Sequence, residues 1–325
     1  MNCPECGAPA PDAAAVCPQC GEALTGGGEE LAAEGGPVAN AREASSTASA
    51  DATRRRFREH ARILGRYRVL GELGRGGMGV VYRCKDEVGG IQVAVKALPP
   101  ELSWYTAEME EVRENFQLVS RLIHQNIAAV RTLERDPESG DYYLILECVE
   151  GLDLRRWRRR QGGRVPLAGL LSILRQVAAA LDFSHGQKII HRDIKPSNVM
   201  VRPDGVVKVL DFGLAAQIHT SLSRVSGSQY GTAGTPPYMA PEQWRGQLQD
   251  AATDQYAFGV MTYELLAGRL PFDSHEVSVL RAAVLHEQPA RIAELPDAAW
   301  TALRRAMAKR RQGRFASCRE FVEAL

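Results

Sequence analysis

The chain has 325 residues, of which 45% are hydrophobic and 24% are charged, a composition typical of globular proteins and sufficient for roughly two domains. Its 40 lysines and arginines almost balance its 39 aspartates and glutamates, so the formal net charge is +1 and no global field favours nucleic acid or an anionic membrane. There is no run of 18 apolar residues and no basic-then-apolar leader. We therefore expect a cytoplasmic protein without membrane or nucleic-acid partners.

Four of the seven cysteines lie in two short repeats near the N-terminus, CPEC and CPQC, each followed by glycine. Thiolates separated by two residues in a tight turn can face one cation, and two such pairs complete the tetrahedron of a structural Zn²⁺. The pattern predicts a zinc ribbon over residues 1–24 with the ligands Cys3, Cys6, Cys17 and Cys20. Redox-active pairs or disulfides are the alternative. So short a segment cannot form a hydrophobic core, so the metal would supply the folding free energy.

The predicted ribbon and the residues after it are acidic, because residues 1–50 carry seven acids and one arginine. Phosphates would be repelled by this charge, so we expect the ribbon to contact protein. Residues 25–60 are poor in aromatic and branched apolar side chains, which predicts a flexible linker. Residues 54–68 contain seven arginines and one glutamate, and we expect a solvated helical lead-in, with an anion-binding arm as the alternative.

Three short β-branched runs follow, YRVLGELG, VVYRCKDEV and IQVAVKAL, and they predict three strands. Between the first two lies LGRGGMGVV, whose glycines allow backbone N–H groups to approach phosphates closely. Alone this pattern is weak, because Gly-rich hairpin turns recur by chance. The strands on both sides, and Lys96 in VAVK on the third strand, distinguish it from a dinucleotide-binding loop, which a helix follows.

Three polar side chains farther along the chain are expected to meet. Asp193 and Asn198 belong to HRDIKPSN, and VMVRPDGVVKVLDFG predicts a hairpin that turns at Asp204-Gly205 and returns the chain to Asp211. Phosphoryl transfer needs such a group, with one carboxylate to orient and deprotonate the attacking hydroxyl and hard oxygen ligands for Mg²⁺.

With these motifs, and with APE at residues 240–242, the chain from about residue 66 to 325 resembles the protein kinase family. The resemblance implies an α+β, two-lobed fold with a small β-rich N-lobe over about 66–147 and a larger, mostly helical C-lobe over about 150–325, preceded by the ribbon and the linker. It also implies ATP and Mg²⁺ or Mn²⁺ as cofactors and protein substrates. Lys195 and Thr235 match the serine/threonine branch, so we expect an active serine/threonine protein kinase of the bacterial type.

The resemblance also assigns roles to individual residues. Asp193 is implied as the catalytic base, Lys195 as a group that helps neutralise the γ-phosphate, and Lys96 as the contact to the α- and β-phosphates. Asn198 and Asp211 are implied as the magnesium ligands. The implied nucleotide-binding residues are Leu73, Gly74, Gly76, Gly77, Met78, Gly79, Val80, Val81, Ala94, Lys96, Glu147, Val149, Asn198 and Asp211, with Leu146 behind the adenine.

Further roles implied by the resemblance are structural or regulatory. Asp254 resembles the helix aspartate that supports the catalytic loop, with an ordinary N-terminal helix aspartate as the alternative, and Glu242 and Arg314 match a structural ion pair. Arg192 is implied to bind a phosphate on the activation segment, with a bracing role as the alternative. The expected phosphosites are Ser226, Ser228 and Thr232, while Thr235 is expected to bond to the catalytic loop.

One position departs from the family pattern. Most members have a glutamate on the helix after the third strand, and counting nine residues back from His124 in HQNI gives Asn115. Helical periodicity groups Asn115 with an apolar face and Glu114 with a polar face; the predicted apolar face comprises Val112, Leu118, Val119 and Leu122. Glu114 after a one-residue shift, or Glu111 one turn earlier, could replace the missing carboxylate.

The missing charge should cost roughly 1–1.5 kcal/mol of alignment, on the order of tenfold in rate. That loss slows an enzyme without abolishing its activity. A pseudokinase that binds nucleotide and partners is the main alternative function, and a nucleic-acid-binding ribbon regulated by the kinase domain is a second one.

Overall fold

The computed structural model describes residues 57–76, 79–100, 105–212 and 235–325. By its contacts the chain divides between residues 48 and 49, and every described residue belongs to the second unit. Several predicted positions lie outside the described residues: the zinc ligands Cys3, Cys6, Cys17 and Cys20, the loop residues Gly77 and Met78, and the phosphosites Ser226, Ser228 and Thr232.

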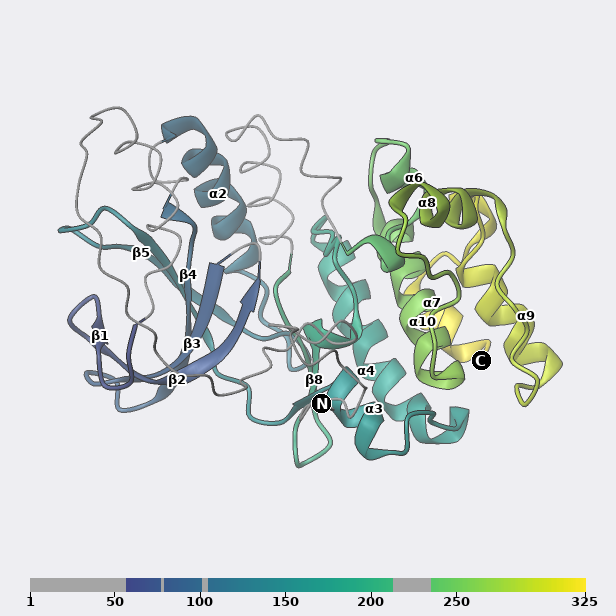
Figure 1. The fold of residues 1–325 in the computed structure, drawn as a ribbon, viewed down its shortest axis with the longest axis horizontal. Coiled ribbons are helices and arrows are strands. Elements are labelled where there is room, and N and C mark those ends of the chain that lie inside the picture. Colours follow the sequence, from purple (N-terminus) through teal and green to yellow (C-terminus); the bar gives the residue numbers. More distant parts are fainter. Residues whose placement is uncertain (1–56, 77–78, 101–104, 213–234) are drawn as a thin grey trace, which may run out of the picture. The chain divides into compact units, whose positions relative to one another are not determined.

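The first lobe is built on an antiparallel sheet that has six strands among the described residues, in the order β1-β2-β3-β4-β6-β5. The strands are β1 (Arg62–Ile63), β2 (Tyr67–Gly76), β3 (Gly79–Asp86), β4 (Gln92–Ala97), β5 (Val130–Arg135) and β6 (Tyr142–Glu147). Helix α2 (Thr106–Val119) packs on β5 and lies alongside this sheet (Figure 1). The three strands predicted from the sequence are β2, β3 and β4, so that prediction is confirmed.

Strand alternation gives this sheet two different faces. On β4, Val93 and Val95 are buried in a cluster with residues of β1, β2, β3 and β6, so Ala94 and Lys96 belong to the other face. The residues before β2 close the cluster, since Ile63 is buried within it and the ring of Phe57 packs against Tyr82 with a centroid separation of 5.6 Å.

The helical lead-in expected over residues 54–68 is wrong for the described part of that segment, which includes β1, paired antiparallel with β2. Arg62, Arg66 and Arg68 in this segment form ion pairs. Arg66 binds Asp86 through two hydrogen bonds of 2.7 Å, and Arg62 binds Glu87 at 2.7 Å. These two arginines are neutralised locally, so they do not form an anion-binding arm.

The second lobe is mostly helical. Its helices are α3 (Leu154–Arg160), α4 (Leu167–Gly186), α6 (Pro241–Trp244), α7 (Ala251–Ala267), α8 (Val277–His286), α9 (Asp297–Ala306) and α10 (Cys318–Glu323), with 3₁₀ turns η2 (Pro196–Asn198), η3 (Pro236–Tyr238) and η4 (Arg311–Gly313). Helix α4 packs against α7 and α10, and α9 packs against α7 (Figure 1). The predicted α+β fold, with a β-rich first lobe and a mostly helical second lobe, is thereby confirmed.

Helix α4 is the one helix among the described residues that is long and apolar enough to cross a membrane by length and composition. Seven of its apolar residues are nevertheless buried inside the lobe, among them Leu170, Leu174 and Val177. Residues of α2, α7 and α10 belong to the same buried cluster. We therefore interpret α4 as a core helix.

A small sheet, β7-β8-β9, connects the two lobes, with β7 (Leu152–Asp153), β8 (Val199–Val201) and β9 (Val207–Val209). Strands β8 and β9 form the predicted hairpin, and Gly205 in its turn has φ +81°. Val209 accepts a bond of 2.9 Å from the N–H of Ala128 and donates one of 2.8 Å to the carbonyl of Asn126. These bonds attach the hairpin to the segment that enters β5, two residues before Asp211.

Candidate active site

Cross-strand register gathers predicted nucleotide-binding residues on one face of the first sheet. Gly74 pairs with Val81, Val81 with Lys96, and Ala94 with Leu146. Directly paired residues share a face, and Ala94 and Lys96 are two positions apart, so these side chains all lie on the same side. This side is opposite the buried cluster that contains Val93 and Val95.

Val80 and Leu73, two of the predicted nucleotide-binding positions, present their side chains differently. The side chain of Val80 is buried in the cluster on the opposite face of the sheet, so only its backbone could approach a nucleotide there. Leu73 is on β2 with 49% of its surface exposed.

The turn between β2 and β3 requires glycine at residue 79, because Gly79 has φ +110° and an added Cβ would lie 2.0 Å from the carbonyl oxygen of Ala97.

Glu147 braces the connection between the lobes. Its carboxylate binds Lys208 on β9 at 3.0 Å and accepts the N–H of Ala129 at 2.9 Å. The side chain is therefore occupied, and residues 147–149 would contact a nucleotide through their backbone. Lys208 was not singled out from the sequence, because it lies 61 residues from Glu147 and belongs to no motif.

Asp193 is 6% exposed, and both of its carboxylate oxygens are held. Oδ1 accepts the N–H and the hydroxyl of Thr235 at 3.1 and 2.8 Å, while Oδ2 lies 2.7 Å from Nζ of Lys195. Lys195 also donates to the hydroxyl of Thr235 at 2.6 Å. The predicted contact of Thr235 with the catalytic loop is confirmed, and these bonds fix the orientation of the carboxylate.

The hairpin brings Asn198 and Asp211 together, since the N–H of Leu210 donates to the carbonyl of Asn198 at 2.8 Å. The side-chain amide nitrogen of Asn198 donates to the backbone carbonyl of Asp193 at 2.8 Å. The amide oxygen of Asn198 therefore points away from Asp193. An amide oxygen and the carboxylate of Asp211 are the hard ligands that Mg²⁺ prefers. The two residues therefore fit a magnesium ion.

Lys96 reaches from the first sheet to the hairpin, with its Nζ 3.2 Å from Oδ2 of Asp211. Burial alone would raise the pKa of Asp211, but the ammonium group of Lys96 outweighs it and holds that pKa below its usual value. Asp211 is therefore ionised at neutral pH. In the structure the acidic partner of Lys96 is Asp211. The sequence had left the identity of that partner open.

The structure supports the predicted register of α2 at its central positions. Asn115 is half-buried, Glu114 is exposed, and Val112 and Val119 are buried. The assignment of Leu118 to the apolar face is wrong, because half of its surface is exposed.

Asp254, fully buried on α7, supports the catalytic loop. Its carboxylate accepts the N–H groups of Arg192 and His191 at 2.7 and 2.8 Å and lies 2.7 Å from Nε2 of His185. Burial would raise the pKa of Asp254, but the bond with His185 and the bond from the N–H of His191 help to keep that pKa below its usual value. The predicted role of Asp254 is confirmed. No sequence motif marked the bond of His185 with Asp254.

Two residues of the site have left-handed backbone conformations that are uncommon outside glycine, Arg192 with φ +69° and Asp211 with φ +57°. Such conformations cost about 1–3 kcal/mol each and persist where the surroundings hold them. Asp254 holds Arg192, and packing holds the segment around Asp211. The ring of Phe212 is buried and lies 4.7 Å from that of His191, which bonds through Nε2 to the carbonyl of Leu210 at 2.7 Å.

Arg192 combines a fixed backbone with an unused donor. Its carbonyl accepts a bond from the side chain of Gln243 at 3.3 Å, while its Nε is buried and has no hydrogen-bond partner among the described residues. The predicted phosphosites lie outside those residues, so the proposed phosphate contact stays a prediction.

The predicted ion pair in the second lobe is confirmed. Arg314 binds both carboxylate oxygens of Glu242, at 2.7 and 2.9 Å, and the two side chains are 0% and 3% exposed. Burial would raise the pKa of Glu242, but the guanidinium group of Arg314 outweighs it and lowers that pKa. The hydroxyl of Thr253 donates a further bond to Glu242 at 3.0 Å.

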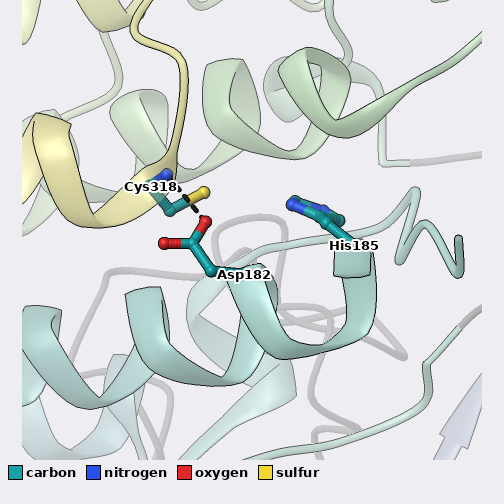
Figure 2. A group of neighbouring side chains, drawn as sticks. All are labelled: Asp182, His185 and Cys318. Atoms are coloured by element: carbon teal, nitrogen blue, oxygen red, sulfur yellow. Dashed lines mark hydrogen bonds between the residues drawn. The ribbon is translucent and has the colours of Figure 1, made fainter. Parts of the chain in front are cut away.

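A second group of metal-binding residue types lies away from this site, formed by Asp182, His185 and Cys318 (Figure 2). Each member already has a structural role. Asp182 accepts the N–H groups of Cys318 and Arg319 at 2.8 and 2.9 Å and so caps α10, and His185 is bonded to Asp254. Burial raises the pKa of the Cys318 thiol well above its usual value, which disfavours the thiolate that a metal needs. We interpret this group as structural.

Residues 67–324 match the family described as the protein kinase domain. The serine/threonine-protein kinase PksC of Streptomyces coelicolor is 38% identical over 83% of this chain and 50% of its own length. Pkn1 of Myxococcus xanthus is 36% identical over 80% of this chain and 38% of its own length, and PrkC of Bacillus subtilis is 35% identical over 73% and 35%. The chain thus spans half or less of the length of these three relatives.

Among solved structures, the kinase domain of PknI from Mycobacterium tuberculosis is similar to this chain with a TM-score of 0.64 and 26% identity, over 83% of this chain and 97% of that one. The family match over residues 67–324 includes the site residues described above. The chain belongs to the protein kinase family, and its relatives place it with the bacterial-type serine/threonine protein kinases.

Proposed function

We propose that the chain is a Mg-ATP-dependent serine/threonine protein kinase that phosphorylates protein substrates. The observation that carries this proposal is the convergence of Asp193, Asn198, Asp211 and Lys96, which two lobes bring together and hold with short hydrogen bonds. Their two carboxylates, amide oxygen and ammonium group are the kinds of group that phosphoryl transfer requires. The kinase names of the relatives point the same way.

Each residue has a role that its geometry permits. Bound Mg-ATP supplies the transferable phosphoryl group and part of the charge neutralisation. Asp193 would orient the substrate hydroxyl and accept its proton, while Lys195, 2.7 Å away, offsets negative charge beside it. Asn198 and Asp211 would hold the cation, and Lys96 would donate to the phosphates.

Transfer of radiolabelled phosphate from ATP to a mixture of Ser- and Thr-containing peptides tests the proposal. The wild type should label the peptides, and Asp193→Asn should reduce labelling to background, since a neutral amide cannot accept the proton. His286→Gln serves as the control, because His286 is exposed on α8. Equal labelling by the wild type and Asp193→Asn would refute the assigned role.

A nucleotide-binding pseudokinase is the second candidate, and Asn115 is the observation that favours it. Against it stands the ion pair between Lys96 and Asp211, because Lys96 retains an acidic partner. A pseudokinase would show an ATP-dependent rise in melting temperature but no labelling of any peptide, whereas the proposed enzyme would show both.

We also propose that phosphorylation of the activation segment regulates the enzyme. The support is the buried Nε of Arg192, which has no partner among the described residues and could bind a phosphate at Ser226, Ser228 or Thr232. After incubation with ATP, mass spectrometry should detect phosphate within residues 214–234, and phosphatase treatment should lower the activity. An active enzyme without phosphate in this segment would refute the switch.

For the N-terminal part we propose the domains 1–24 as a zinc ribbon that contacts protein and 25–60 as a linker, followed by the kinase domain over 66–325. The two Cys-x-x-Cys pairs support the ribbon. The isolated segment 1–24 should bind one equivalent of Zn²⁺ and lose its structure in chelator, while residues 54–325 should keep their activity. A folded, metal-free ribbon would contradict this. We also propose a cytoplasmic location, because α4, the described helix that is long and apolar enough to cross a membrane, packs inside the second lobe.

A further inference from the structure

Helix α3 is unusually basic, since five of its seven residues, LRRWRRR, are arginines. With Glu150 and Asp153 as the two nearby acids, residues 150–161 carry a local net charge of +3, whereas the whole chain has a net charge of +1. A run of charges on a helix is ordinarily a solvated face. The surroundings of α3 therefore decide whether its charge has a function.

Helix α3 borders the catalytic loop. It packs against η2, which contains Asn198, and against β8 (Figure 1). Leu154 at its start is fully buried, and the carboxylate of Asp153 caps it by accepting the N–H of Arg156 at 2.9 Å. The helix is thus anchored at its first turn, and its arginines are held in a fixed relation to the loop.

A chain of hydrogen bonds connects Asp193 with α3. Thr235, bonded to Asp193, accepts the N–H of Tyr238 at 2.9 Å through its carbonyl. The hydroxyl of Tyr238 donates to Glu264 at 2.5 Å, and the other oxygen of Glu264 lies 3.4 Å from Arg158 of α3. The three residues of η3 span roughly 6 Å, and an extended peptide advances ~3.3 Å per residue. Substrate side chains a few residues from the acceptor hydroxyl would therefore reach α3.

Arg155 and Arg159 are one helical turn apart and share a face of α3. Burial raises the pKa of Tyr238, and Arg158 and Arg155 oppose that rise, so both guanidinium groups lie near η3. Arg158 is engaged by Glu264. The Nε atoms of Arg155 and Arg158 are buried and have no hydrogen-bond partner within the described parts of the chain.

We propose that α3 is part of the protein-substrate site and selects acidic segments, with aspartate or glutamate side chains near the acceptor Ser or Thr bound by Arg155 and Arg159. The inference rests on the proposed kinase function. Arginine binds carboxylates through paired, charge-assisted hydrogen bonds. The buried Nε of Arg155, which has no partner among the described residues, would gain most from such an acceptor. Glu264 is already bonded to Tyr238 and Arg158, so it does not offer a basic peptide a free partner.

The test uses three peptides that share one acceptor and differ only in flanking residues, which are acidic, neutral or basic. Initial rates are measured for the wild type, for Arg155→Glu/Arg159→Glu, and for Arg304→Glu, which makes a charge reversal at an exposed position of α9. For the wild type we expect KM for the acidic peptide to be about tenfold lower than for the basic one, and this difference to shrink at high salt. The double variant should reverse the order of the two KM values. Arg304→Glu should behave as the wild type.

A second measurement does not require turnover. A dye-labelled acidic peptide with alanine at the acceptor position is titrated with each variant, and binding is followed by fluorescence anisotropy. If no peptide is phosphorylated, the kinase proposal fails, but the binding order still tests α3. An order of KM or binding that is the same in the wild type and the double variant, or no preference for acidic peptides in the wild type, would overturn the role of α3.

Discussion

The two sides of the candidate active site are held in different ways. On the C-lobe side, the catalytic loop is fixed by the fully buried Asp254, and a buried Glu242–Arg314 ion pair stabilises the helices beneath it. On the sheet side, Lys96 is positioned by its strand and by one ion pair with Asp211, and α2 contributes Asn115 at the inward position. The comparison indicates that the loop that holds Asp193 is preorganised, whereas the alignment of Lys96 is adjustable.

The largest effect is expected at Asp254. Asp254→Ala leaves two buried N–H groups, those of His191 and Arg192, without an acceptor, and it removes the bond that holds the left-handed backbone at Arg192. We expect a loss of about 3–5 kcal/mol in the free energy of unfolding, measured by urea denaturation, together with loss of activity. His185→Gln, which removes one bond only, should cost much less. Equal stability of Asp254→Ala and the wild type would show that the loop is not braced from α7.

The ion pair of the C-lobe predicts an acid-dependent loss of stability. Glu242→Gln leaves Arg314 buried without a charged partner, which should cost about 3 kcal/mol or more at neutral pH. Because Arg314 lowers the pKa of Glu242 in the folded state, the stabilisation is complete above the unfolded-state value, near 4.5, and is lost as pH falls through the lower folded-state pKa. The difference in unfolding free energy between wild type and Glu242→Gln should therefore shrink below about pH 4.5. A difference that does not change with pH would contradict the assignment.

On the sheet side, substitution should affect catalysis more than stability. Lys96→Met keeps the length of the side chain but removes the charge that pairs with Asp211, so we expect kcat to fall about 100-fold with a melting temperature close to that of the wild type. The measurement is a steady-state assay beside a thermal unfolding curve. A wild-type kcat in Lys96→Met would mean that the phosphate contact lies elsewhere, and a large loss of stability would contradict the contrast between the two sides.

What the sequence could predict follows the same division between local and distant interactions. Short motifs with local periodicity predicted the strands β2, β3 and β4, the β8–β9 hairpin and the candidate nucleotide- and metal-binding residues. The bond between His185 and Asp254 joins residues 69 positions apart, and that between Lys96 and Asp211 joins residues 115 apart, so no local pattern contains them.

The segment before β2 was predicted incorrectly for a related reason. Its arginines suggest a solvated surface, but Arg66 pairs with Asp86 twenty residues away, and the apolar residues Phe57 and Ile63 cover the sheet. Only the folded register of β2 and β3 makes these partners neighbours. Local composition therefore describes this segment poorly, although it describes the strands on either side of the Gly-rich turn well.

The smallest effect is expected at Asn115, and it tests the adjustable side most directly. Asn115→Glu restores a carboxylate at a half-buried position of α2, and a charged acceptor exceeds a neutral one by about 1 kcal/mol. The rate should then rise several-fold and by no more than about tenfold, as measured by kcat with a saturating peptide. Glu114→Gln is the matched control, because Glu114 is exposed on the neighbouring position of the same helix and its loss should change kcat by less than about twofold. If Glu114→Gln instead abolished activity, the register that places Asn115 inward would be wrong. Lys96 would then depend on Glu114, which could reach it only after a shift of α2.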